Sequence, residues 1–192
     1  MPYSSDAGKE YIDWRLSVIT TGKPTGWVLD VGCGSGTYHN RYANNWLKGY
    51  KWVGVEVWEP YVDKFKLAEK YDTLIIKDIS NFWKDHNGGI FDICFFGDVL
   101  EHMSKEDAVW NVEQALKYAD NVIISIPCGY YPQDEFEGNP YERHVKDDWT
   151  MQEALDTFPS IVSYEQKEEI GVLVCRDLAR IFRERSVRAL SS

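Results

Sequence analysis

The sequence predicts an α/β fold built on parallel strands in a single domain. Short apolar runs rich in Val and Ile alternate along the chain with segments whose apolar residues recur at helical spacing, which is typical of βαβ units. One of these runs, Trp27 to Val31, leads into the glycine-rich segment Gly32-Cys33-Gly34-Ser35-Gly36 and then into a helical pattern. Strand, glycine loop and helix in this order make a nucleotide site in an open α/β sheet.

The remaining elements follow the same alternation. Strands are predicted at residues 27–31, 51–57, 73–77, 91–96 and 121–126, and a final strand pair at 161–166 and 172–175. Helices are predicted at residues 6–20, after Gly36, from Pro60, after a capping box that begins at Ser104, at 151–156, and in a basic tail over 176–190. A polar, aromatic loop over about 127–148 is longer than structureless loops usually are, which points to a functional role.

Composition limits the classes of function. The 192 residues carry a net charge of −10, which disfavours a broad nucleic-acid surface. No apolar run approaches membrane-spanning length, and the N-terminal residues lack signal-peptide character. The four cysteines are far apart and show no C-x-x-C spacing, so we expect reduced thiols in a cytoplasmic protein. The oligomeric state is not predicted.

The sequence of the glycine loop limits the class of ligand that it can bind. Its pattern is G-x-G-x-G after the acid Asp30, and Thr37 stands where a G-x-G-x-x-G dinucleotide loop would have its last glycine. A pyrophosphate needs helix N–H groups and no anion beside it, whereas an acid suits a ligand with positive charge, such as an amino-acid ammonium. This disfavours an NAD-dependent oxidoreductase. The segment resembles motif I of the class I S-adenosylmethionine-dependent methyltransferases.

The resemblance implies a Rossmann-like fold with a mostly parallel seven-stranded sheet, one antiparallel strand and helices on both faces. It implies one methyltransferase domain over residues 1–192, with an N-terminal helical segment at 1–22 and a cofactor-binding half at 23–127. Residues 128–192 would form the acceptor-binding half and a C-terminal helix. S-adenosylmethionine is the implied cofactor, and S-adenosylhomocysteine is its product.

The resemblance also assigns cofactor contacts to the ends of the strands. The glycine loop would touch the amino-acid end of the cofactor, Glu56 and Val57 the ribose, and Trp58 would lie beside the adenine. An acid after the third strand would bond the adenine amino group and the next residue would cover the ring. The implied set is Asp30, Gly32, Cys33, Gly34, Ser35, Gly36, Glu56, Val57, Asp78, Ile79, Gly97 and Asp98.

A second constellation follows the fourth strand. Asp98, Glu101 and His102 form a D-x-x-E-H run at the carboxyl edge of the sheet, and His144 in the long loop can face His102. Two carboxylates and two imidazoles suit acid–base catalysis or a divalent metal. The run resembles metal-free methyltransferases of small molecules, sugars and lipids. It also resembles an E-x-x-E-H group, including small-RNA 2′-O-methyltransferases, whose side chains bind a divalent metal. Because Asp98 stands where that group has Glu, the prediction includes no metal and makes a histidine the base.

The sequence therefore predicts an enzyme that methylates an oxygen or nitrogen of a small-molecule, sugar or metabolite acceptor. Two alternatives remain open at this point: a methyltransferase-like binding module without catalysis, and a metal-assisted RNA 2′-O-methyltransferase. In the basic tail, Arg176, Arg180 and Arg183 share a helical face. We expect these arginines to lie in solvent or to neutralise the acidic body rather than to bind phosphate.

Overall fold

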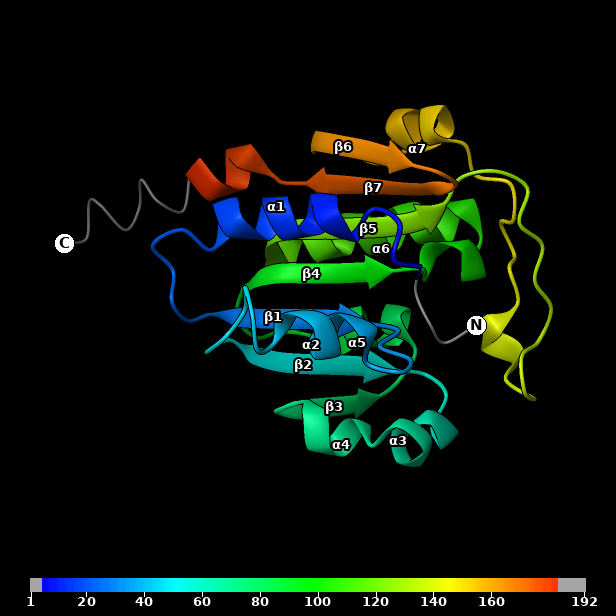
Figure 1. The fold of residues 1–192 in the computed structure, drawn as a ribbon, viewed down its shortest axis with the longest axis horizontal. Coiled ribbons are helices and arrows are strands. Elements are labelled where there is room, and N and C mark those ends of the chain that lie inside the picture. The colour runs from blue at the N-terminus through cyan, green and yellow to red at the C-terminus, as the bar shows by residue number, and fades with distance from the viewer. Residues whose placement is uncertain (1–4, 183–192) are drawn as a thin grey trace.

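The computed structural model describes residues 5–182, and these form a seven-stranded sheet with helices on both faces (Figure 1). The order across the sheet is β3-β2-β1-β4-β5-β7-β6. The strands are β1 (Trp27–Val31), β2 (Lys51–Glu56), β3 (Thr73–Ile76), β4 (Phe91–Gly97), β5 (Ala119–Pro127), β6 (Ile161–Lys167) and β7 (Ile170–Cys175). All pairs from β3 to β5 are parallel, and β7 runs antiparallel to both of its neighbours. The predicted fold class, including its one antiparallel strand, is confirmed.

Alternation along the strands builds two cores, one on each face of the sheet. On β4, Ile93 and Phe95 face one side while Cys94 and Phe96 face the other, and all four are fully buried. Strands covered on both faces in this way are continuously apolar, as their sequences are. The sheet is therefore a rigid platform whose carboxyl edge can hold side chains in fixed positions.

Within the described residues, seven α-helices, two short 3₁₀ turns and a further helical segment at 178–182 accompany this sheet. One core receives residues from α1 (Lys9–Ile19), α2 (Thr37–Tyr42), α3 (Pro60–Phe65) and α4 (Leu67–Lys70). The opposite core receives residues from η1 (Leu100–His102), α5 (Ile79–Asp85), α6 (Lys105–Tyr118) and α7 (Met151–Thr157). The predicted cap of α6 is present, because the Ser104 hydroxyl accepts a hydrogen bond from the Asp107 N–H at 3.1 Å.

The apolar spacing predicts a helical face that includes Trp46 and Leu47 after Gly36, and one that includes Phe65 and Ala68 after Pro60. Both faces differ in the structure. Helix α2 ends at Tyr42, so Trp46 is 44% exposed, whereas Leu47 is buried. Lys66 adopts a left-handed conformation with φ 53°, which separates α3 from α4. Because the helix restarts there, Leu67 is buried in place of the predicted Ala68. Local backbone breaks of this kind leave no signal in apolar spacing.

Helix α5 is absent from the sequence prediction, because its seven residues are too few for a clear periodic pattern. The signal that could have found it is Asp78, the residue just before it. One carboxylate oxygen of Asp78 accepts hydrogen bonds from the N–H groups of Ser80 at 2.9 Å and Asn81 at 3.2 Å. Asp78 is therefore an N-cap, whatever else it contacts.

The segment after β5, residues 128–148, is here called the strap. It folds back on itself through backbone hydrogen bonds from Gly129 to Trp149 and from Tyr131 to Asp147, both 2.7 Å. Its one regular element is the turn η2 (Pro140–Glu142). The strap runs beside the carboxyl ends of the strands (Figure 1).

Three further expectations concern the basic tail, the cysteines and membrane-spanning helices. Residues 178–182 are helical, residues 176 and 177 precede this helical segment, and the predicted basic tail beyond 182 lies outside the described residues. Arg180 donates to Asp120 at 3.1 Å, as expected for neutralisation of the acidic body. All four cysteines are buried free thiols. Over residues 5–182, no helix has both the length and the apolar character to cross a membrane.

Candidate functional site

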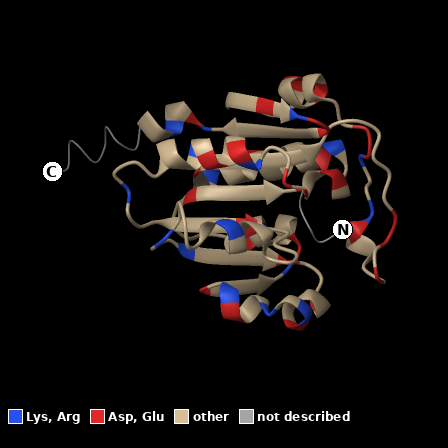
Figure 2. Ribbon diagram, viewed as in Figure 1, with Lys and Arg blue, Asp and Glu red and all other residues tan. Residues whose placement is uncertain are grey.

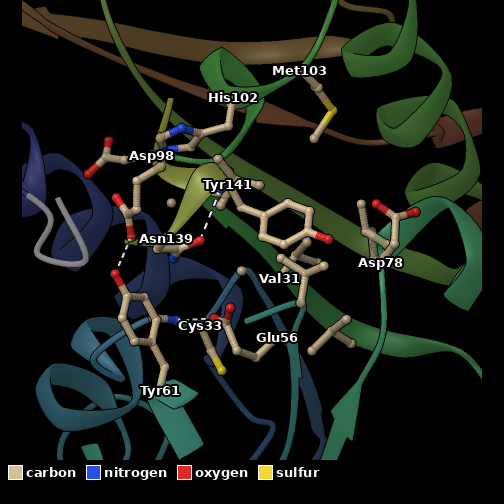
Figure 3. A pocket seen from close by; sticks show the side chains of 18 of the residues that line it. Val31, Cys33, Glu56, Tyr61, Asp78, Asp98, His102, Met103, Asn139 and Tyr141 are labelled. Atoms are coloured by element: carbon tan, nitrogen blue, oxygen red, sulfur yellow. Dashed lines mark hydrogen bonds between the residues drawn. The ribbon is translucent and has the colours of Figure 1, made fainter. Parts of the chain in front are cut away.

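A cavity opens at the carboxyl ends of β1, β2, β3 and β4, where an open α/β sheet binds its ligand. The strand ends supply Val31, Val55, Glu56, Lys77 and Gly97 to its lining. Figure 3 shows Glu56 and Asp78 on this side, with His102 and Tyr141 facing them from across the cavity. The cavity is called the cofactor pocket below.

The glycine loop forms one end of this pocket. Gly32, Gly34 and Gly36 all adopt left-handed φ values, of 58°, 49° and 78°, which residues with a Cβ rarely accept. At Gly32 a Cβ would also lie 2.7 Å from a Val99 methyl group. Gly32, Cys33 and Gly34 line the pocket, whereas Ser35 and Gly36 are buried behind it and are not among its lining residues.

Asp30 is not brought to the pocket lining. Strand alternation turns it to the face opposite Val31, where its carboxylate accepts a 2.6 Å hydrogen bond from the Tyr71 hydroxyl. Burial raises the pKa of Asp30 to about 7, although the bond from Tyr71 acts to lower it. Asp30 thus lies behind the pocket wall at the end of β1, and its contact with the cofactor stays a prediction.

Glu56 lines the pocket at the end of β2 and is 4% exposed. One carboxylate oxygen accepts from the Gly34 N–H at 2.9 Å and the other from the Trp58 N–H at 2.8 Å. Burial raises the pKa of this carboxyl, and the backbone donors oppose that rise. Because each oxygen has a second lone pair, Glu56 can still accept hydrogen bonds from a ligand.

The other predicted cofactor residues separate into lining and non-lining positions. Val57, Asp78, Ile79, Gly97 and Asp98 line the pocket, as predicted. Trp58 does not line it and instead lies against Tyr141, with ring centroids 6.2 Å apart. Tyr141 of the strap lines the pocket in its place, beside the rings of Tyr38 and Tyr61.

A second cavity of about 420 Å³ adjoins the first, and Asp98 and His102 line both. Glu101, Tyr131, Gln133 and His144 also contribute to its wall. It is called the acceptor cavity below. Asp98 sits at the boundary in a left-handed conformation, with φ 56°, and its carboxylate accepts a 3.0 Å bond from Ser125. Asp is among the few residues that tolerate this conformation, which turns the chain sharply after β4.

Three of the four predicted catalytic residues cluster in this second cavity. Glu101, His102 and His144 each offer one ligand atom, and these atoms all lie within 4.8 Å of one another. The two imidazole centroids are 4.9 Å apart. Asp98 is not part of this cluster, although it lines the same cavity.

Backbone carbonyls orient both histidines. His102 Nδ1 lies 3.1 Å from the Arg143 carbonyl oxygen, and His144 Nδ1 lies 2.6 Å from that of Tyr131. A carbonyl can only accept, so each Nδ1 carries the proton and each Nε2 is left with its lone pair. Burial lowers the pKa of His102 to about 4 and also lowers the pKa of His144, so both rings are neutral at pH 7.

The pKa of Glu101 is shifted in the opposite direction to those of the two histidines. It is 1% exposed, and within residues 5–182 its Oε2 atom has no hydrogen-bond partner. Burial, followed by the negative charge of Asp98, raises the pKa of Glu101 well above its usual value. The backbone carbonyl oxygen of Glu101 accepts hydrogen bonds from the N–H groups of Val145 and Lys146 in the strap, at 2.9 and 3.0 Å. Neighbouring titratable groups whose pKa values are both strongly shifted are typical of a functional site.

Sequence analysis missed the residues that join the strap to the cofactor pocket. The Tyr61 hydroxyl on α3 donates to the buried Glu142 carboxylate at 2.9 Å, as the dashed line from Tyr61 in Figure 3 shows. Asn139 accepts from the Tyr141 N–H at 3.0 Å, and Asn139, Tyr141 and Glu142 all line the pocket. The Gly-Asn-Pro turn was the available signal, because Asn before Pro is a common cap of a short helical turn.

Comparison with known proteins agrees with this geometry. A family model described as a methyltransferase domain matches residues 29–124, half of the chain. No curated protein matches the sequence significantly.

Solved structures share the fold at low sequence identity. A methyltransferase from Clostridium acetobutylicum that depends on S-adenosylmethionine has a TM-score of 0.61 and 14% identity, over 88% of this chain and 91% of that one. Magnesium protoporphyrin IX methyltransferase from Synechocystis, with S-adenosylmethionine bound, has a TM-score of 0.55 and 19% identity, over 86% and 77%. The N-terminal domain of EvdMO1, solved with S-adenosylhomocysteine and D-fucose, has a TM-score of 0.57 and 15% identity, over 84% and 81%. The chain therefore belongs to the class I methyltransferases, enzymes that use S-adenosylmethionine as cofactor.

Proposed function

We propose that this enzyme methylates an oxygen or nitrogen of a small-molecule acceptor, such as a sugar or another metabolite, held in the acceptor cavity. The observation that carries the proposal is the shared wall of the two cavities, made by Asp98 and His102. A group in the acceptor cavity would reach the cofactor pocket along this wall, beside the imidazole of His102. Similar folds are described with D-fucose and with apigenin, which are also small molecules.

In the cofactor pocket, the residues present fit S-adenosylmethionine from end to end. Gly32 and Gly34 would lie against its amino-acid end, since their lack of a Cβ lets a ligand approach the backbone. Glu56 would accept the ribose hydroxyls through its remaining lone pairs. Asp78 and Ile79 would meet the adenine, while one oxygen of Asp78 continues to cap α5.

The sulfonium group supplies an already activated methyl group, so the protein has two tasks: alignment and removal of one proton. Alignment of the acceptor atom by the strap and the cavity wall can contribute roughly 7–11 kcal/mol in favourable cases. His102 Nε2 would take the acceptor proton as the acceptor lone pair forms its bond to the methyl carbon and the methyl–sulfur bond breaks, with S-adenosylhomocysteine as the leaving group. The lowered pKa of His102 keeps that atom unprotonated at neutral pH.

The charge distribution supports a small acceptor rather than a nucleic acid. The net charge is −10, and Figure 2 shows Lys and Arg scattered among Asp and Glu over several elements. Within the described residues, no Lys or Arg lines the acceptor cavity. A polyanion would find little to neutralise its phosphates at this entrance.

The test is methyl transfer from S-adenosylmethionine to a panel of sugars, phenols, nucleosides and amines. Transfer to at least one acceptor, with loss of turnover in His102→Ala and retained cofactor binding, is the expected result. Transfer only to RNA, or turnover unchanged in His102→Ala, would contradict the proposal.

A divalent metal is a second version of the same site, favoured by the 4.8 Å clustering of Glu101, His102 and His144. Carbonyl-oriented imidazoles with exposed Nε2 lone pairs are also the arrangement of metal-binding histidines. In this version the metal would replace the histidine base by lowering the pKa of the acceptor hydroxyl. Dialysis against a chelator separates the two, because it should silence a metal enzyme and leave an acid–base enzyme active.

A further inference from the structure

Lys9, the first residue of α1, is a buried cation that the mechanism above does not use. It is 2% exposed, although lysine is almost never fully buried unless its charge is compensated. A position at the start of an amphipathic helix would normally let such a side chain reach water. The burial of Lys9 therefore needs a reason in its surroundings.

Those surroundings place Lys9 against the wall of the cofactor pocket. Its Nζ donates to the Tyr38 hydroxyl at 2.7 Å and lies 4.2 Å from the centroid of that ring. Tyr38 lines the pocket directly after the glycine loop. Tyr38 is also seated tightly, because a Cβ at Gly97 would fall 1.9 Å from its ring. The Lys9–Tyr38 pair thus marks the glycine-loop end of the pocket.

The rest of the pocket lining is acidic. Its carboxylates are Glu56, Asp78, Asp98 and Glu142, and Lys77 is the one described cation among the lining residues. Lys77 follows β3, two strands away from the glycine loop of β1, and its Nζ pairs with Asp85 at 2.8 Å. A ligand carboxylate at the glycine-loop end would meet negative charge unless another cation were close.

The amino-acid end of S-adenosylmethionine carries such a carboxylate beside its ammonium. We propose that Lys9 and the Tyr38 hydroxyl together recognise this carboxylate, with Tyr38 on the pocket wall and Lys9 supplying the positive charge behind it. The ammonium of the cofactor would be matched by the acidic side of the pocket. This proposal rests on the cofactor of the family and makes no assumption about the acceptor.

The surroundings of Lys9 lower its pKa overall, and nearby carboxylates limit that shift. Burial lowers the pKa of Lys9, and Arg41 acts in the same direction. The negative charges of Asp98, Asp6 and Asp30 oppose that shift. A charge-assisted hydrogen bond is roughly twice as strong as a neutral one, so a charged Lys9 is well suited to hold an anion.

The alternative is that Lys9 only joins α1 to α2 and has no role in binding. A ligand that differs by one group separates the two, since decarboxylated S-adenosylmethionine keeps the sulfonium and the amine and lacks only the carboxylate. Calorimetry would compare the two ligands on the full chain and on Lys9→Met. The exposed Lys48→Met provides a control on the same face.

The wild-type enzyme should bind S-adenosylmethionine at least about tenfold more tightly than the decarboxylated ligand, as expected for a bond to a charged group. Lys9→Met should bring the two affinities together by weakening S-adenosylmethionine alone, and Lys48→Met should keep the wild-type ratio. Equal weakening of both ligands in Lys9→Met, or an unchanged ratio, would overturn the proposal.

Tyr38→Phe keeps the ring that packs on Gly97 and removes only the hydroxyl, so it covers the case in which Lys9→Met fails to fold. It should reduce the preference for the carboxylated ligand as well. A folded Tyr38→Phe variant with the full wild-type preference would exclude the hydroxyl from this role and contradict the proposal as stated.

Discussion

The two cavities are built by different means. The wall of the cofactor pocket comes mainly from the ends of parallel strands, whose positions are fixed by backbone hydrogen bonds to neighbouring strands. The acceptor cavity depends on the strap, a segment with one short 3₁₀ turn that is held by scattered contacts such as Tyr61–Glu142 and Glu101–Val145. A strand end can lose a side chain and keep its place, whereas the strap keeps its place only through such contacts.

The largest effect should follow from filling the glycine loop. Gly34→Val puts a branched side chain into the wall of the cofactor pocket at a backbone φ of 49°, so cofactor binding should be abolished. Calorimetry with S-adenosylhomocysteine measures the affinity, and circular dichroism checks the fold. Gly22→Val is a matched control, because Gly22 is also left-handed at φ 72° but a Cβ added there would meet no described atom within 4 Å. If Gly34→Val binds normally, the loop does not contact the cofactor.

The next largest effect concerns the shared wall. His102→Ala should lower kcat by about 10²–10⁴, the usual contribution of a general base, with little change in cofactor affinity. The control is His86→Ala, which should leave kcat unchanged because His86 lines neither cavity.

The pH profile tests the same residue. A histidine base works only when neutral, and a pKa lowered to about 4 keeps His102 neutral well below the usual histidine range. The acid limb of kcat/KM should therefore fall near pH 4 to 5 rather than near 6.5. A limb at the ordinary histidine value would mean that the buried environment of His102 is not maintained during turnover.

A smaller effect, on stability, should come from Glu101. Its folded pKa is raised, so the folded state resists ionisation and stability is lost as pH rises from the unfolded value of 4.5 toward the folded pKa. Glu101→Gln cannot ionise and removes this loss, so at pH 8 it should be more stable than wild type by up to about 1.4 kcal/mol for each unit by which the folded pKa exceeds the unfolded one.

Urea denaturation at pH 8 and pH 5 measures the difference, which should shrink at the lower pH. The exposed Glu113→Gln on α6 is the control. A Glu101→Gln variant that is less stable than wild type at pH 8 would show that the carboxylate is compensated in the folded protein.

The smallest effect should come from removing one hydrogen bond that holds the strap. Tyr61→Phe removes the donor to Glu142 and should ease local opening of the strap by about 0.5–1.5 kcal/mol, the usual net contribution of one hydrogen bond. Hydrogen exchange over residues 133–146 measures this opening, and Tyr164→Phe on the exposed edge strand β6 is the control. Unchanged exchange would mean that the backbone pairing within the strap is sufficient to hold it.

The contrast between the cavities also explains what the sequence could predict. The strands, the caps at Pro60 and Ser104 and the pocket positions Gly32, Glu56 and Asp78 follow from local patterns of period, glycine and charge. Asp30 shows the limit of such patterns, because a strand end brings an acid to the right edge without saying which face it points to.

The strap was predictable only as a long loop near the site. The approach of His144 to His102 was an expectation from the loop's position, whereas the Tyr61–Glu142 bond joins residues 81 apart. No local pattern encodes a contact of that kind, since it depends on how the strap folds across the finished sheet.

The insertion of β7 between β5 and β6 has a consequence for synthesis on the ribosome. β5 carries the buried apolar run Val122–Ile126, and one of its edges pairs only with β7, which ends at Cys175. Until that residue has emerged, the nascent chain presents an unpaired, apolar strand edge of the kind that recruits other chains. The final edge strand, β6, is by contrast largely exposed and ends in Glu165, Gln166 and Lys167. The order of the last two strands thus covers the apolar edge of β5 with β7 and leaves the charged β6 as the free edge of the sheet. A chain shortened within β7 should therefore aggregate during expression.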